Sequence, residues 1–224
     1  MLNTGHFPNP LRTTTTVVLM KLSKPDYTKP NAYHPIALED TISKVIESVV
    51  VELLSYIAEL HQLIPPQCFG GRPGRTGEEA ILILSEKIMN AWKERDTYSV
   101  IVMDVVSAFN NVHHKRLSHN LRKRKLPDFI VHWIESFLSD RYTQLCFSGV
   151  DSARITINAG VPQGSPISPI LYLFYNVDLL EIPGTDGLSR GFIDDIAYGV
   201  QGELDQHNAK KLQRMLMKAE EWRE

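Results

Sequence analysis

The stretch SRGFIDDIAYGV, residues 189–200, places two adjacent carboxylates, Asp194 and Asp195, in the middle of an apolar run. An ionised carboxylate among such side chains is costly to bury unless a partner offsets its lost hydration. A divalent cation is one such partner, because Mg²⁺ prefers oxygen ligands. The alternative is a turn between two strands of a hairpin, in which both side chains face water. This stretch alone leaves both interpretations open.

An acidic residue interrupts a second apolar segment, SVIVMDVVSAFNNV, residues 99–112. Its β-branched first half has no helical spacing and predicts a buried strand. Asp104 stands near the end of that run, where a lone aspartate can instead cap the following turn. If the hairpin of residues 193–200 lies beside this strand, Asp104 and Asp194 face one cluster of Mg²⁺ ions. Successive strand residues point to opposite faces, so we expect Asp194 to be the principal ligand and Asp195 the weaker one.

Five segments of the chain carry short motifs in a fixed order. The first three are KLSKPDYTKPNAYHPIAL, QCFGGRPGRTGEEA and MDVVSAFNNV. They are followed by AGVPQGSPISPILYLFYNVDLL, residues 159–180, and by FIDD. Across residues 17–200 their order and spacing resemble the sequence boxes of reverse transcriptases. The resemblance is closest to the enzymes of non-LTR (LINE-like) retrotransposons, especially those of fungal elements.

The resemblance implies an α+β fold, namely the fingers and palm of a right-hand polymerase. In such a fold helices pack on one face of an antiparallel palm sheet, and here we expect the thumb to be absent. The implied division of the chain is fingers (1–80), palm (81–112), fingers (113–167) and palm (168–224). The implied reaction is RNA-templated synthesis of DNA, in which two Mg²⁺ ions, or Mn²⁺, assist the transfer of a dNTP to a primer 3′-hydroxyl.

The resemblance also assigns site residues. The implied catalytic and metal-binding groups are the carboxylates of Asp104, Asp194 and Asp195 and the backbone carbonyl of Val105. The implied dNTP-binding residues are Lys24, Arg72, Phe109, Gln163 and Gly164. A bulky ring at Phe109 would exclude the 2′-hydroxyl that distinguishes RNA from DNA. The basic segment after His114 would contact nucleic acid through Lys115, Arg122, Lys123 and Arg124, although a solvated helix face explains these charges equally well.

Two positions depart from the family pattern. His34 stands where the family carries an arginine that contacts the triphosphate, and Asn110 stands where it carries an aspartate. A neutral, shorter histidine predicts weaker nucleotide binding. Two other functions therefore stay open. One is a catalytically silent remnant that only binds nucleic acid or a partner, and the other is a different palm enzyme such as a nucleotide cyclase.

Composition limits these alternatives. The chain has 224 residues, of which 43% are hydrophobic and 22% charged, as in globular domains with a real core. Its two cysteines offer neither a disulfide framework nor a zinc site. A net charge of −2 argues against tight binding of nucleic acid by this chain alone. We expect the chain to be a fingers-and-palm piece of a larger retroelement polyprotein or a truncated gene copy. We expect an RNA template, a DNA primer and dNTPs as partners, no membrane, and a nuclear, cytoplasmic or organellar location, while the oligomeric state is not predicted.

Periodicity predicts the elements around these motifs. Residues 13–22 are expected to form a strand, residues 143–158 a hairpin, and residues 39–60, 78–95, 114–125, 128–139, 170–180 and 203–224 helices. In the second of these helices Ile81, Leu84, Ile88 and Trp92 are expected to face inward. Ser165 and Pro166 have the residue types of an N-cap and a first helical position, so they predict the start of the next-to-last helix.

Overall fold

The computed structural model describes residues 4–223 and divides into two compact units. Unit 1 consists of Met1–Ile57 and Ser107–Leu171, and unit 2 consists of Ala58–Val106 and Tyr172–Glu224. Each unit therefore combines two stretches of chain that are distant in sequence. Both units contain helices and a β-sheet, which confirms the expected α+β class.

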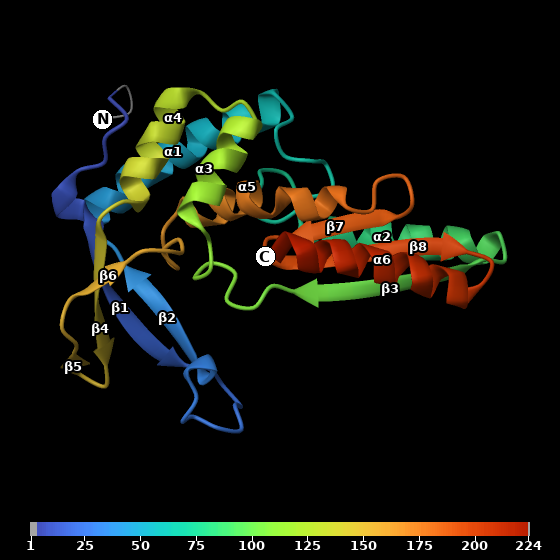
Figure 1. Cartoon of the computed structure of the whole chain (residues 1–224), viewed down its shortest axis with the longest axis horizontal. Coiled ribbons are helices and arrows are strands. Elements are labelled where there is room, and N and C mark those ends of the chain that lie inside the picture. Colours follow the sequence, from blue (N-terminus) through green and yellow to red (C-terminus); the bar gives the residue numbers. More distant parts are fainter. Residues whose placement is uncertain (1–3, 224) are drawn as a thin grey trace. The chain divides into compact units, whose positions relative to one another are not determined.

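Unit 2 is built on a three-stranded antiparallel sheet in the order β3-β8-β7 (Figure 1). Its strands are β3 (Thr97–Asp104), β7 (Leu188–Phe192) and β8 (Asp195–Gly202). Its helices are α2 (Gly77–Lys93), most of α5 (Ser168–Glu181) and α6 (Asp205–Arg223). The Tyr198 hydroxyl donates to the Leu179 carbonyl at 2.7 Å, and the Ser189 hydroxyl donates to the Leu180 carbonyl at 2.6 Å. These bonds fasten α5 to one face of the sheet, as an antiparallel palm requires.

Strand β3 differs from its prediction as a strand buried on both faces. It lies at the edge of the described sheet, and its side chains alternate between the two faces. Val100 and Val102 are 37% and 69% exposed. The expectation of full burial was wrong because a continuous β-branched run can also form a half-covered edge strand of an antiparallel sheet.

Unit 1 contains a mixed sheet in the order β2-β1-β4-β5, with β6 also paired to β4. The strands are β1 (Thr13–Met20), β2 (Tyr33–Leu38), β4 (Arg141–Phe147), β5 (Val150–Asp151) and β6 (Ile155–Ile157). β1 runs antiparallel to β2 and parallel to β4. The antiparallel pairing of β4 with β6 confirms the hairpin expected over residues 143–158.

The helices of unit 1 are α1 (Thr41–Leu60, mostly in this unit), α3 (His114–Lys123) and α4 (Asp128–Leu138), which Figure 1 labels. The unit also contains the 3-10 turns η1 (Asn9–Arg12) and η2 (Pro30–Ala32). An aromatic cluster fills the core beside α4, where Trp133 stacks on Phe137 with ring centroids 5.6 Å apart and Phe7 meets both rings edge-on. Burial of these large rings is a main source of stability for the unit.

The helices form where periodicity predicts them, but the buried face of α2 differs from the predicted one. Ile81 and Trp92 of α2 are 67% and 68% exposed, so the inward orientation predicted for them was wrong. The buried position of that helix is Ala91. Apolar residues occupy more than one side of α2, and periodicity alone cannot choose between such sides. In the described chain, none of the helices is both long and apolar enough to span a bilayer.

The start of α5 also differs from its prediction. The helix begins at Ser168, three residues after the expected N-cap. The hydroxyl of Ser165 does not cap a helical N–H group but donates to the carboxylate of Glu47. Ser165 was therefore misassigned, because its residue type fits a cap while its tertiary partner is a buried acid on another helix.

Candidate functional site

Three carboxylates gather at one end of the sheet of unit 2. The register pairs Asp104, the last residue of β3, with Asp195, the first residue of β8. Directly paired residues of an antiparallel sheet project on the same face, so these two side chains are neighbours. Asp194 occupies the two-residue turn that joins β7 to β8, and Val105 follows directly after β3. The two acidic segments that are far apart in sequence are thus adjacent in the fold.

The carboxylates of this site repel one another electrostatically. Burial, and then the negative charges of Asp195 and Asp104, raise the pKa of Asp194. The pKa of the nearby Tyr172 hydroxyl is also raised, first by burial and then by the charge of Asp194. Within residues 4–223 no basic side chain forms an ion pair with any of the three aspartates. Such an excess of negative charge fits a divalent cation.

The protein alone does not supply a complete set of ligands for such a cation. Among the described residues, no three His, Cys, Asp or Glu side chains are arranged as a metal-binding group. The donor chemistry, all oxygen and all acidic, is nevertheless the chemistry that Mg²⁺ prefers, and Mg²⁺ commonly keeps water and substrate phosphate among its ligands. The carboxylates therefore fit an ion that is completed by its substrate.

The turn that carries Asp194 is held in a strained conformation. Ile193 has φ of 59°, a left-handed value that is unfavourable for a β-branched residue. Its carbonyl accepts a 2.6 Å hydrogen bond from the buried Asn176 amide of α5. Gly70 lies so close that an added Cβ would stand 2.6 Å from Ile193 Cγ1. The sequence did not single out Asn176, and its only signal is a polar residue within an apolar helix.

A second candidate region is the loop of residues 160–165 in unit 1. The Val161 amide donates to the Phe109 carbonyl at 2.8 Å, and the Ala37 amide donates to the Gln163 carbonyl at 2.7 Å. Gly164 has φ of +115°, and an added Cβ would stand 2.6 Å from the Ala37 carbonyl oxygen. Main-chain bonds thus connect this loop to Phe109 through Val161 and to the end of β2 through Gln163.

The two predicted cations of the nucleotide side have different surroundings. Arg72 is engaged within unit 2, where its Nε and Nη2 donate to the Glu59 carboxylate at 2.7 and 2.8 Å. Its side chain is 5% exposed, and Nη1 donates to the carbonyls of Pro65 and Cys68. Lys24 instead lies in the exposed loop between β1 and β2. Of these two cations within the described residues, Arg72 would have to give up an ion pair to meet a phosphate, whereas Lys24 stands in an exposed loop.

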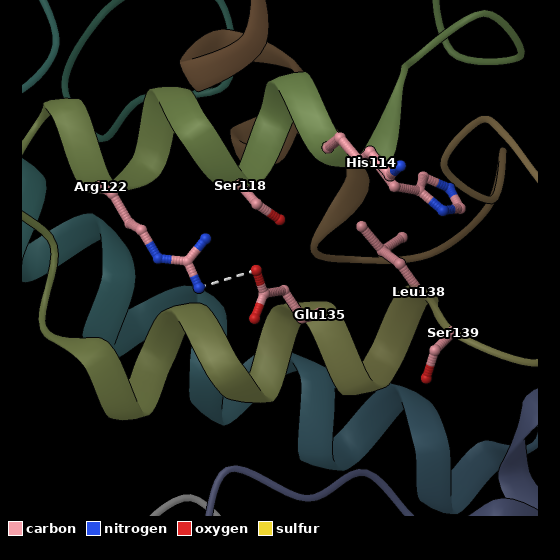
Figure 2. A pocket seen from close by; sticks show the side chains of 7 residues that line it. His114, Ser118, Arg122, Glu135, Leu138 and Ser139 are labelled. Atoms are coloured by element: carbon pink, nitrogen blue, oxygen red, sulfur yellow. Dashed lines mark ion pairs between the residues drawn. The ribbon is translucent and has the colours of Figure 1, made fainter.

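The basic residues of α3 lie beside a pocket of about 400 Å³. Figure 2 shows that the pocket opens between α3 and α4 and that Arg122 points toward Glu135. These two side chains form an ion pair at 2.8 Å. His114, which the sequence did not single out, also lines the pocket, and its Nε2 lies 2.8 Å from the Gly160 carbonyl oxygen. Lys115 lines the same pocket, and Lys123 and Arg124 follow at the end of the helix.

Comparisons with known proteins agree with this arrangement. A family model described as reverse transcriptase (RNA-dependent DNA polymerase) matches residues 22–223. The probable RNA-directed DNA polymerase from transposon X-element of Drosophila melanogaster is 28% identical over 97% of this chain and 24% of its own length. The RNA-directed DNA polymerase from mobile element jockey of the same species is 25% identical over 100% of this chain and 25% of its own length.

A likeness of fold accompanies these sequence matches. The structure of apo telomerase from Candida tropicalis, truncated from its C-terminal domain, superposes with a TM-score of 0.63 at 12% identity. The match covers 94% of this chain and 47% of that one. The likeness supports the expected fingers-and-palm fold. The chain spans about a quarter of the length of the curated relatives it matches, 24% and 25% in these two cases.

Proposed function

The chain belongs to the reverse transcriptase family, and from this premise we propose that it supplies the fingers and palm of an RNA-directed DNA polymerase of a non-LTR retrotransposon. A primer 3′-hydroxyl would attack the α-phosphorus of a dNTP while an RNA strand serves as template. In this proposal the fingers are residues 1–80 and 113–167, and the palm is residues 81–112 and 168–224.

The observation that carries the proposal is the group of three carboxylates on the sheet of unit 2. Asp104 and Asp195 are paired across two strands, and the pKa of Asp194 is raised by burial and by both of their charges. These side chains, with the backbone carbonyl of Val105, would hold two Mg²⁺ ions, or Mn²⁺ in their place. When bound, such ions lower the pKa of the primer hydroxyl and neutralise the triphosphate and the leaving pyrophosphate.

We assign the nucleotide side to residues that the structure supports unequally. Phe109 and Gln163 are tied through the main chain of one loop, which supports a joint role at the sugar of the incoming dNTP. The Phe109 ring would exclude a 2′-hydroxyl and so select dNTP over rNTP. Lys24 would contribute a phosphate contact. His34 stands where the family carries an arginine that contacts the triphosphate, so nucleotide binding would be weaker than with the arginine. Arg72 would bind a triphosphate only by leaving Glu59.

The proposed contacts with the template use basic residues near both ends of α3. Lys115, Arg122, Lys123 and Arg124 would contact phosphates of the RNA template. Arg122 is partly neutralised by Glu135, which would reduce its contribution to phosphate binding.

Primer extension by the whole chain tests this function. With poly(rA), oligo(dT), dTTP and Mg²⁺, we expect the unmodified chain to lengthen the primer. Asp104→Asn and Asp194→Asn should each lower the rate by at least about 10³-fold, because each removes a charge needed to hold the ions. The matched control Asp205→Asn removes an acid at the start of α6, away from the three carboxylates in sequence, and should keep the rate. A chain that lengthens no primer, or carboxylate variants that keep the rate, would overturn the proposal.

A further inference from the structure

Unit 1 contains a buried cluster of charged side chains that the proposed chemistry does not use. Glu39 follows β2, Glu47 lies on α1, and Arg141 begins β4. The side chains of Glu39 and Arg141 are 0% and 1% exposed, and Glu47 is 0% exposed. Arg141 Nη2 donates to Glu39 Oε1 at 2.6 Å. Buried ionic groups of this kind are costly and need an explanation.

Two carboxyl groups of the cluster lie beside the guanidinium of Arg141, and Glu39 Oε2 has no hydrogen-bond partner among the described residues. Burial, and then the nearby charge of Glu47, raise the pKa of Glu39 to about 8, against the opposing influence of Arg141. Glu39 and Arg141 therefore form the buried surroundings in which the Glu47 carboxyl group is held.

The side chain of Glu47 joins α1 to the loop of residues 160–165. Its Oε1 accepts from the Ser43 hydroxyl at 2.7 Å, one helical turn away. Its Oε2 accepts from the hydroxyl of Ser165, which directly follows Gln163 and Gly164. Ser165 is 4% exposed, so this bond is shielded from competing water. A hydrogen bond in a dry environment is stronger than one at the surface.

Ala37, at the end of β2, holds the other side of the loop of residues 160–165. The Ala37 amide donates to the Gln163 carbonyl at 2.7 Å, and Gly164 packs directly against the Ala37 carbonyl. Ala37 and Glu47 therefore fix the loop from two sides, one by main-chain contact and one by a buried carboxylate. Neither contact uses the side chain of Gln163, which stays half-exposed.

We propose that Glu47 is a positioning residue that fixes the backbone of Gln163 and Gly164 through its hydrogen bond from Ser165, so that the loop is preformed for the incoming dNTP. This inference rests on the proposed function for its kinetic consequence. Arg141 and Glu39 hold Glu47 in place and have no role at the substrate. Loss of the link would leave the loop able to bind a dNTP only after an ordering step, which weakens apparent affinity rather than the chemical step.

The chain offers a matched pair of variants for the test. Ser165→Ala removes only the hydroxyl that links the loop to Glu47, whereas Ser43→Ala removes the other hydroxyl on the same carboxylate and leaves the loop attached. Hydrogen–deuterium exchange of residues 159–166 in the whole chain reports on loop order without any need for activity. We expect faster exchange there in Ser165→Ala and no change in Ser43→Ala.

Kinetics provide the second readout. Ser165→Ala should raise KM for dTTP by about tenfold, the effect of one lost buried hydrogen bond, with kcat largely kept. Ser43→Ala should change neither constant, and Ser165→Thr, which keeps the hydroxyl, should restore both the exchange rate and KM. Equal exchange and equal KM in the two alanine variants would overturn the inference. If the unmodified chain lengthens no primer, the proposed function fails, while the exchange contrast still decides whether Glu47 fixes the loop.

Discussion

The buried carboxyl groups of unit 1 and the aspartates of unit 2 differ in whether the protein supplies them with a cation. In unit 1 the buried Glu39 and Glu47 have an internal cation, Arg141, and Glu47 has a hydroxyl partner for each oxygen. In unit 2 the aspartates of β3 and of the β7–β8 turn face one another without a basic partner among the described residues. An acid that has partners inside the protein has a structural role. Acids that only repel one another retain the capacity to bind a cation from solution.

The largest expected contrast comes from removing a charge in each group. Arg141→Met leaves two buried carboxyl groups without their cation and should lower the free energy of unfolding by about 3–5 kcal/mol. Asp194→Asn removes a repelling charge and should leave stability unchanged or slightly higher in Mg²⁺-free buffer. Urea denaturation of both variants at neutral pH measures the difference. Equal losses would show that the aspartates are as structural as the buried cluster.

The pH dependence of stability sharpens the same comparison, with an effect no larger than that of Arg141→Met. The pKa of Glu39 is raised from 4.5 to about 8, so the folded state holds its proton more tightly than the unfolded state. This contribution is fully present below pH 4.5 and is lost as the pH rises towards 8. Thermal unfolding across this range should show Tm falling with rising pH, and Glu39→Gln, which cannot ionise, should flatten that slope.

A control of opposite sign is available for this experiment. A hydrogen bond from Arg72 lowers the pKa of Glu59, so its contribution is present above the unfolded pKa and is lost only as the pH falls. Glu59→Gln should therefore leave the slope between pH 4.5 and 8 unchanged. A slope that survives in Glu39→Gln would refute the assignment of the raised pKa to Glu39.

A smaller effect is expected at the turn that carries Asp194. Asn176→Leu removes the hydrogen bond to the Ile193 carbonyl and should cost about 1–3 kcal/mol in urea denaturation. Ile193→Gly relieves the positive φ of that residue, so in the Asn176→Leu background it should recover part of the loss. If the second change adds to the loss, the turn is held by the Ile193 side chain rather than by Asn176.

The smallest effect is the gain from Mg²⁺ itself. At ten times its Kd, an ion that binds only the folded state stabilises it by about 1.4 kcal/mol. Differential scanning fluorimetry should show a Tm rise with Mg²⁺ in the unmodified chain and in Asp205→Asn, but not in Asp104→Asn. Arg141→Met should keep the rise on its lower baseline, because its lesion is in the other group of acids. A rise that is equal in Asp104→Asn would place the ion elsewhere.

Local patterns were sufficient for most elements of secondary structure, although they did not predict the strand β2. Helical spacing predicted α1 and α4, and turn residues predicted the hairpin of β4 and β6. The motifs around Asp104 and Asp194 predicted that two segments distant in sequence would meet, and the register of β3 with β8 brings them together. Each of these inferences depends on contacts between neighbours in sequence or on a motif whose spacing carries the information.

The inward faces and the polar partners could not be predicted in the same way. Ile81 and Trp92 have helical spacing, yet which side of α2 is covered depends on the rest of the fold. Ser165 has the residue type of a cap, and only the packing of α1 beside its loop gives it Glu47 as a partner. Arg72 fits a phosphate by type, but Glu59 is already its counter-ion.

By itself the chain's order of residues determined the class of fold, most of its strands and helices, and the family to which it belongs, because periodicity and motif spacing are local properties. Only the tertiary structure decided which acids are neutralised inside the protein and which are left facing one another. That distinction depends on the distance and burial of charges brought together from remote segments, and electrostatic energy is set by those two quantities rather than by residue type.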